Sequence, residues 1–169
     1  MMLSPAFLAQ NSTYIENLMR HRFVYDVSRL LLQREPPSLV TVLTAEVDNA
    51  GVDLVMTFGQ ITRQIQMKTL AKLSTANPYA ISESLSGVVG GCVVWSCYDR
   101  SSLEPTCYHM MGGRGDARMR DLLSFPKGTK KKGGIKVRRR GYRQIRIRDA
   151  AHRNISLKQL VSILFDLRD

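Results

Sequence analysis

The sequence lacks long apolar runs and paired cysteines, and it has no acidic residue between Lys127 and Arg148. A membrane-spanning helix needs about 18 or more consecutive apolar residues, so we expect no membrane partner. Cys92, Cys97 and Cys107 are odd in number and form no CxxC pair, which argues against a disulfide framework and a zinc finger. The N-terminal residues have neither a charged lead nor a long apolar stretch, unlike a signal peptide. We therefore expect a cytoplasmic protein.

The basic residues are concentrated in one part of the chain. Of the 25 Lys and Arg residues, 11 lie between Lys127 and Arg148, and the other 14 balance the 14 Asp and Glu residues. This segment therefore carries the whole net charge of +11. A cationic patch on a neutral body is typical of a phosphate-binding surface, and a solvated tail is the alternative interpretation. We expect nucleic acid to contact these members of the segment: Lys130, Lys131, Lys132, Lys136, Arg138, Arg139, Arg140 and Arg143.

Hydrophobic periodicity predicts a domain that begins and ends with a helix. A helix is expected over 13–34, where Thr13 and Glu16 fit a capping box. Strands are expected over 39–47, 52–58, 61–70, 88–98, 106–111 and 142–148. Helices are expected over 77–87, 116–123 and from Ser156 to 167, with a flexible loop over 127–134. Because strands come in a run before the next helix, the predicted class is α+β with a mixed sheet.

The spacing around Gly59 and Gln60 predicts a hairpin with a two-residue loop. In that register the numbers of paired residues sum to 119, so Asp53 falls opposite Gln66. Lys68 lies two residues beyond Gln66 and shares its face of the sheet. A carboxylate, a carboxamide and an ammonium group are thus expected at one end of the sheet.

These three groups suit phosphodiester hydrolysis. Mg²⁺ or Mn²⁺ prefers oxygen ligands, which the Asp53 carboxylate and the Gln66 amide oxygen offer. Lys68 would position a water molecule or stabilise negative charge on the phosphorane. The alternative is a polar surface pair with a cross-strand ion pair.

The motif resembles that of a known nuclease superfamily. The string EVDNAGVDLV, from Glu46 to Val55, is followed by QMKT at 66–69. Together they resemble the PD-(D/E)XK superfamily, and the QxK form is similar to its Mrr-like restriction-endonuclease branch. The order helix, three strands, helix, strand over roughly Tyr14 to Tyr98 is also that of the superfamily core. The resemblance implies a restriction-endonuclease-like core with C-terminal additions, a divalent metal and nuclease activity.

The resemblance also implies residue roles. Asp53 matches the metal-binding aspartate, Gln66 stands where many members have Asp or Glu, and Lys68 matches the catalytic lysine. Glu16 and Asp48 are expected as further acidic ligands, although a capping box and a turn also account for them. Because Gln66 is neutral, the site is expected to bind Mg²⁺ more weakly than one with three carboxylates.

We therefore expect a metal-dependent endonuclease that hydrolyses DNA rather than RNA. The predicted organisation is a nuclease-like core over 1–126, a basic nucleic-acid-binding segment over 127–148, and a C-terminal helix over 149–169 packed on the core. Nucleases that cut two strands often pair, so a homodimer is expected by analogy. The alternatives are a catalytically inactive nucleic-acid-binding or scaffold protein of the same fold, and a basic RNA-associated protein of another fold.

Overall fold

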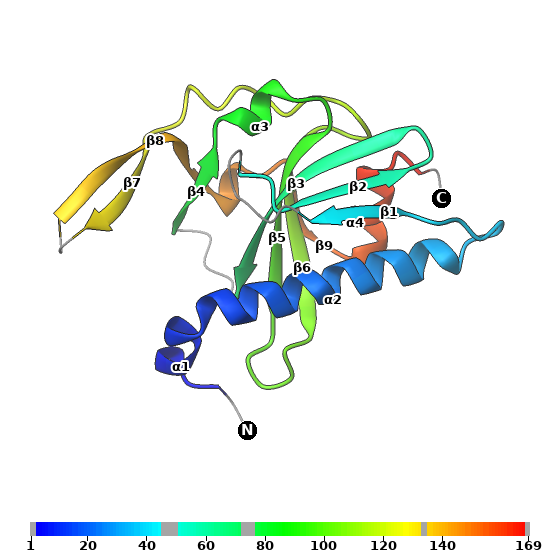
Figure 1. Ribbon diagram of the computed structural model, residues 1–169, viewed down its shortest axis with the longest axis horizontal. Helices are drawn as coiled ribbons and strands as arrows, with labels where there is room; N and C mark the ends of the chain where they lie inside the picture. The colour runs from blue at the N-terminus through cyan, green and yellow to red at the C-terminus, as the bar shows by residue number, and fades with distance from the viewer. Residues whose placement is uncertain (1–2, 45–50, 72–76, 133–134, 168–169) are drawn as a thin grey trace.

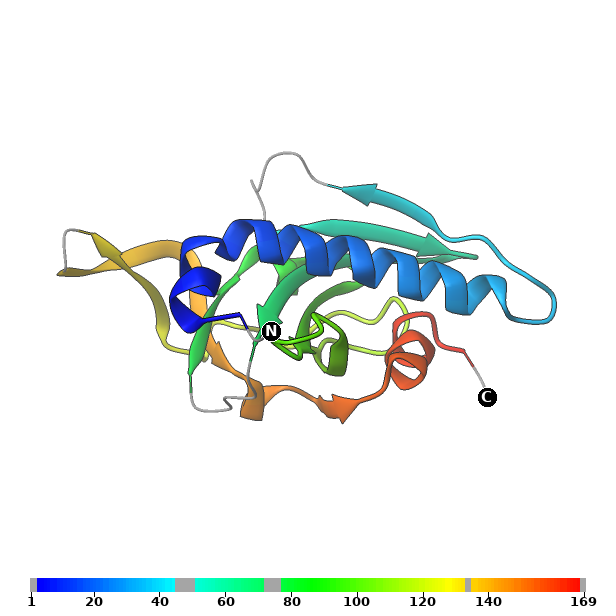
Figure 2. The same ribbon diagram turned by 90° about the horizontal axis from the view of Figure 1, so that it is seen from below.

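The structure, a computed structural model, describes residues 3–44, 51–71, 77–132 and 135–167. It is a mixed α+β protein in three layers (Figure 1). Helices α2 (Ser12–Leu32) and α4 (Leu157–Leu164) cover one face of a six-stranded mixed sheet. A smaller three-stranded antiparallel sheet packs against the other face. Figure 2 shows α2 lying along the large sheet for most of its length.

The strand order of the large sheet is β1-β2-β3-β5-β6-β9, and only the β3–β5 pair is parallel among the pairs described. Its strands are β1 (Thr41–Thr44), β2 (Leu54–Phe58), β3 (Ile61–Leu70), β5 (Gly91–Tyr98), β6 (Pro105–Met111) and β9 (His152–Ile155). The small sheet has the order β4-β8-β7, formed by β4 (Pro78–Ser82), β8 (Ile135–Arg146) and β7 (Lys127–Lys132). The remaining elements are α1 (Pro5–Gln10), α3 (Ser84–Gly87) and the 3-10 helix η1 (Ile147–Asp149).

Alternation along the strands divides the core between the two faces of the large sheet. Ile65 and Met67 of β3 face α2, where Phe23 and Val27 are fully buried. Trp95 of β5 faces the small sheet, in the second core. Burying each such side chain contributes roughly 1.5–3 kcal/mol. The two cores therefore determine which face each strand residue points to.

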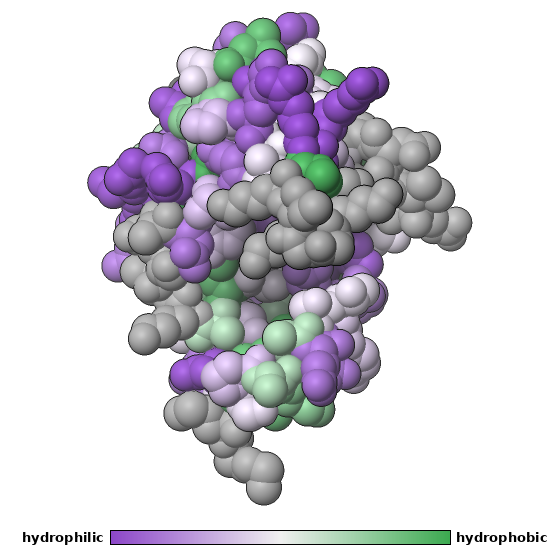
Figure 3. Space-filling view, turned by 90° about the vertical axis from the view of Figure 1, so that its left-hand side faces the viewer, coloured by the Kyte–Doolittle hydropathy of each residue, from purple (hydrophilic) through white to green (hydrophobic). Residues whose placement is uncertain are grey.

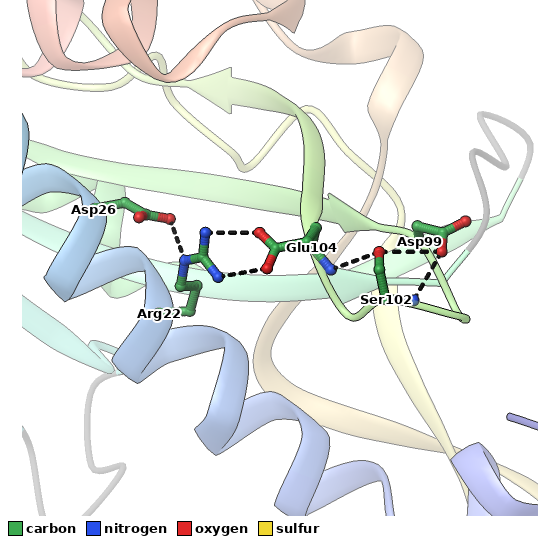
Figure 4. Close-up of polar contacts among 5 residues, drawn as sticks. All are labelled: Arg22, Asp26, Asp99, Ser102 and Glu104. Atoms are coloured by element: carbon green, nitrogen blue, oxygen red, sulfur yellow. Dashed lines mark hydrogen bonds and ion pairs between the residues drawn. The ribbon is translucent and has the colours of Figure 1, made fainter. Parts of the chain in front are cut away.

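An ion-pair network ties α2 to the connection between β5 and β6 (Figure 4). Arg22 Nε lies 2.7 Å from Asp26 Oδ2, and Arg22 Nη2 lies 2.6 Å from Glu104 Oε2. The hydrogen bonds that the Arg22 guanidinium donates to Glu104 and Asp26 raise the pKa of Arg22. Hydrogen bonds from the Ser101 hydroxyl and neighbouring backbone lower the pKa of Asp99, in the same connection, to about 2. The network therefore fixes the long helix against one end of the sheet.

The structure corrects several predicted elements. The helix expected over 77–87 is mostly strand β4, and only Ser84–Gly87 is helical. The loop expected over 127–134 is largely strand β7, and no helix lies within 116–123. The Thr13–Glu16 capping box is also wrong, because α1 precedes α2 and Asn11 occupies the N-cap of α2. In the first two cases β8 provides the pairing that a local pattern cannot reveal.

Other predicted elements are confirmed. The long helix over 13–34 corresponds to α2, and the strand over 61–70 has the bounds of β3. Ser156 and Gln159 form the capping box that opens α4. In the part of the chain that is described, no helix is both long and apolar enough to cross a membrane.

Candidate functional site

The β2–β3 hairpin has the predicted register. Paired positions run from Leu54↔Ile65 to Phe58↔Ile61, and Gly59 takes a positive φ of 58° in the two-residue loop. The regular ladder ends before Asp53, whose N–H donates to the carbonyl oxygen of Ile65 at 2.9 Å. The strand pairing thus brings Asp53 beside β3, as the sequence predicts. Asp53 itself lies one residue beyond the regular β2–β3 ladder.

The Asp53 side chain forms a hydrogen bond to the backbone of β3 just beyond the end of the β2–β3 ladder. Its Oδ2 accepts a hydrogen bond of 2.7 Å from the backbone N–H of Met67. This bond orients the carboxylate toward the residues that follow Gln66 on β3. Lys68, the next residue after Met67, is half-buried, as Asp53 is. Asp53 therefore lies beside Met67 in the second half of β3, one residue before Lys68.

Asp53 and Lys68 line a pocket of about 300 Å³. α2 contributes Glu16 and Arg20 to the same pocket, and β8 contributes Arg139. The full lining is Glu16, Asn17, Arg20, Asp53, Met67, Lys68, Thr69 and Arg139. The pocket thus contains two carboxylates and three cations, contributed by α2, β3, β8 and the residue before β2. We call it the Asp53 pocket.

Gln66, the third predicted catalytic residue, does not line this pocket. Its side chain is 2 % exposed, and its Oε1 accepts a hydrogen bond of 3.1 Å from the backbone N–H of Ser82 in β4. Gly51, with φ of 71°, packs against both residues: an added Cβ would lie 2.3 Å from Ser82 Cβ and 3.1 Å from Gln66 Nε2. Gln66 is therefore enclosed between β4 and the residues leading into β2.

The donor set of the Asp53 pocket fits a hard cation. Glu16, which is exposed on α2, and Asp53 place two carboxylates on one lining, and carboxylate oxygen is a preferred ligand for Mg²⁺ and Mn²⁺. Asp48, the other predicted acidic ligand, lies outside the described residues. Within those residues, Nε of Arg20 is buried without a hydrogen-bond partner, which favours an anion in the same pocket.

The basic strand β8 forms the other wall. Arg139 is half-buried and its guanidinium lies over the ring of Tyr142, 3.5 Å from the ring centroid. Its neighbours Arg138 and Arg140 are exposed. Figure 3, viewed from the side on which β7 and β8 project, shows hydrophilic side chains gathered over the upper part of this surface. Lys130, Lys131, Lys132 and Lys136 lie on β7 and β8, but their side chains are outside the described part.

Arg143 has a different environment from the other predicted nucleic-acid contacts. Its Nε lies 2.6 Å from Glu83 Oε1, and its Nη1 donates to the carbonyl oxygen of Phe125 at 3.0 Å. The Arg143 side chain is only 11 % exposed. The contacts of Arg143 thus anchor β8 to the body of the protein.

Sequence spacing missed a second group of potential ligands. Ligand atoms of Cys97, Cys107 and His109 lie within 4.8 Å of one another, because Cys97 and Cys107 pair directly across β5 and β6. His109 Nδ1 accepts a hydrogen bond of 3.1 Å from the backbone N–H of Asn154. With Nδ1 accepting, a neutral ring carries its proton on Nε2, so neither nitrogen offers a metal a lone pair. The Asn154 hydrogen bond therefore does not fit metal binding by His109.

In comparisons with known proteins, no family model, curated protein or solved structure matched this chain. The Asp53 pocket, with its two carboxylates and three cations, is therefore the feature of the described residues that points to a function.

Proposed function

We propose that this protein is a metal-dependent nuclease that hydrolyses phosphodiester bonds of DNA in the Asp53 pocket. The observation that carries the proposal is the meeting of Glu16, Asp53 and Lys68, from α2, the start of β2 and β3, on one pocket lining. The element order α2, β1 to β3, then β5 parallel to β3, is compatible with part of the restriction-endonuclease-like core that the motif implies; β4 and the short α3 stand where that core has its second helix.

The carboxylates of Asp53 and Glu16 would hold the Mg²⁺ or Mn²⁺ ion. When bound, the ion would polarise the scissile phosphate and lower the pKa of a bound water molecule. The hydrogen bond from Met67 N–H helps to orient the Asp53 carboxylate before substrate binds. Gln66, predicted as a metal ligand, would instead hold β4 beside the site through Ser82.

The cationic side chains would act on the phosphate. Lys68 lies on the same lining as Asp53 and would stabilise negative charge that develops on the phosphorane oxygens. Arg20, which lines the same pocket, would bind oxygens of this phosphate through guanidinium hydrogen bonds. Phosphate contacts of this kind position a strand without reading its sequence.

One observation favours a second function, namely nucleic-acid binding without cleavage on the same fold. Three cations and two carboxylates line the Asp53 pocket, and the Gln66 oxygen is occupied by Ser82. A pocket with this balance binds an anion well and a cation less well. Salt-sensitive DNA binding with no turnover in Mg²⁺ or Mn²⁺ would select this function.

The proposal is tested by cleavage of plasmid, linear, single-stranded and branched DNA, with an RNA strand in parallel. Asp53→Asn removes the charge and keeps an oxygen that can accept the Met67 hydrogen bond, so the fold is expected to survive. Because loss of a metal-binding carboxylate costs several kcal/mol of transition-state stabilisation, we expect a rate at least about 100-fold lower. Asp116→Asn, an exposed position outside the pocket, is the matched control.

Lys68→Ala is the second arm of the same assay. We expect a loss of about 100- to 1,000-fold in kcat, as for removal of one donor to a developing oxyanion. Lys158→Ala on α4, which is outside the Asp53 pocket, should retain full activity. Equal cleavage by the parent, Asp53→Asn and Lys68→Ala would refute the assigned site.

A further inference from the structure

The Asp53 pocket adjoins a second, cationic pocket through a single shared side chain. The second pocket has a volume of about 240 Å³. It is lined by residues 138–143 of β8, together with Glu83 and Lys127. Arg139 lines both pockets. Arg138 and Arg140 line the second one only. The cationic surface of β8 therefore continues into the site that holds Asp53 and Lys68.

Contacts around Arg139 hold it at this junction. Its guanidinium packs on the Tyr142 ring, and Tyr142 pairs with Ser82 of β4. Ser82 N–H in turn donates to Gln66 Oε1, on the strand that carries Lys68. A short series of contacts, from β3 through β4 to β8, thus fixes the distance between the second pocket and the catalytic groups.

The geometry points to Arg139 as a positioning residue that binds the phosphate next to the scissile one. This inference rests on the proposed function and deepens it, because it specifies the substrate class. A site with a second phosphate position acts on a phosphodiester within a nucleotide chain in preference to an isolated phosphodiester. Arg138 and Arg140 lie further along the same surface and would contact later phosphates of the strand.

The first test compares two substrates with Arg139→Ala. An oligonucleotide has neighbouring phosphates, whereas bis(4-nitrophenyl) phosphate has one diester and no neighbour. Since loss of one phosphate contact weakens binding of the whole chain, we expect KM for the oligonucleotide to rise about tenfold, with kcat nearly unchanged. Cleavage of bis(4-nitrophenyl) phosphate, which has no neighbouring phosphate for Arg139 to bind, should fall much less than cleavage of the oligonucleotide. An equal loss on both substrates, or no loss on either, would overturn the inference.

The second test measures binding without cleavage, so that it stays informative if the protein proves not to be a nuclease. Asp53→Asn protein without divalent metal is titrated into a fluorescently labelled oligonucleotide at several salt concentrations. Adding Arg139→Ala should weaken binding about tenfold and reduce the salt slope by about 1. Arg118→Ala, an equal loss of charge at an exposed position outside both pockets and outside the basic segment, is the matched control. Equal effects of the two variants would refute a specific role for Arg139.

Arg139→Lys and Tyr142→Phe distinguish positioning from folding. Lys keeps the charge without the planar guanidinium, so partial rescue of KM is expected. Phe keeps the ring beneath Arg139, so Tyr142→Phe should behave like the parent. If Arg139→Ala lowers the melting temperature and Arg139→Lys restores stability but no substrate affinity, the role of Arg139 is structural and the inference fails.

Discussion

The Asp53 pocket and the Cys97–Cys107–His109 cluster differ in what their donor atoms can still bind. In the pocket, carboxylates of Asp53 and Glu16 share a polar lining with three cations. In the cluster, burial raises the pKa of Cys97 to about 12 and lowers that of His109, so both groups stay neutral near pH 7. The Asn154 hydrogen bond also occupies His109. A cluster of metal-ligating side chains can therefore bind a metal ion only where their lone pairs are free and solvent can reach them.

Removal of metal should produce the largest difference between these two regions. We expect chelation by EDTA to reduce cleavage to background and added Mg²⁺ or Mn²⁺ to restore it, because hard cations bind carboxylate oxygen. Cys97→Ser and Cys107→Ser should leave this requirement unchanged. If Zn²⁺ alone activated the protein and either cysteine variant lost this activation, the metal site would be the cysteine cluster and not the Asp53 pocket.

Glu16→Gln should have a smaller effect. The substitution removes one of the two carboxylates of the pocket and keeps the size of an exposed side chain. Because affinity for Mg²⁺ depends on ligand charge, we expect the Mg²⁺ concentration for half-maximal cleavage to rise about tenfold. Glu35→Gln, just beyond α2, is the control. An unchanged Mg²⁺ dependence would remove Glu16 from the ligand set.

Gln66→Leu tests whether Gln66 supports the pocket from outside. Leu cannot accept the Ser82 hydrogen bond, and an unpaired buried N–H costs about 1–3 kcal/mol, which urea unfolding measures. Gln64→Leu, a less buried position on the same face of β3, should cost less. A Gln66→Glu variant with tighter Mg²⁺ binding would instead show that residue 66 is a ligand.

The smallest effect concerns His109. Burial lowers its pKa in the folded protein, so an unfolded chain takes up a proton near pH 6.5 while the folded chain does not. Stability should therefore be complete above about pH 6.5 and fall as the pH is lowered from there toward the folded-state pKa. His109→Asn keeps an acceptor for Asn154 N–H and should flatten this part of the curve of melting temperature against pH. A parent curve flat over pH 5–7 would contradict it.

Local pattern was sufficient where contacts are local in sequence. The Gly59–Gln60 loop fixes the β2–β3 register by itself, and this register delivers Asp53 next to β3. Ser156 and Gln159 cap α4 through atoms three residues apart. Both features could therefore be predicted from the sequence, as could the long helix α2.

Long-range pairing accounts for what the sequence could not reveal. Asn77-Pro78 looks like a helix start, yet Pro78 begins β4 because Tyr79 pairs with Ile145 far along the chain. The same pairing places Ser82 on Gln66 and Arg139 at the Asp53 pocket. Neither contact leaves a pattern among residues that are close in sequence. The role of Gln66 and the position of Arg139 between the two pockets therefore could not be predicted from the sequence.

The most direct measurement is anomalous diffraction from crystals soaked in Mn²⁺. We expect a peak in the Asp53 pocket, within coordination distance of the Asp53 and Glu16 carboxylates, and its disappearance in Asp53→Asn crystals. No peak in the pocket at saturating Mn²⁺, or a peak only beside Cys97 and Cys107, would contradict it.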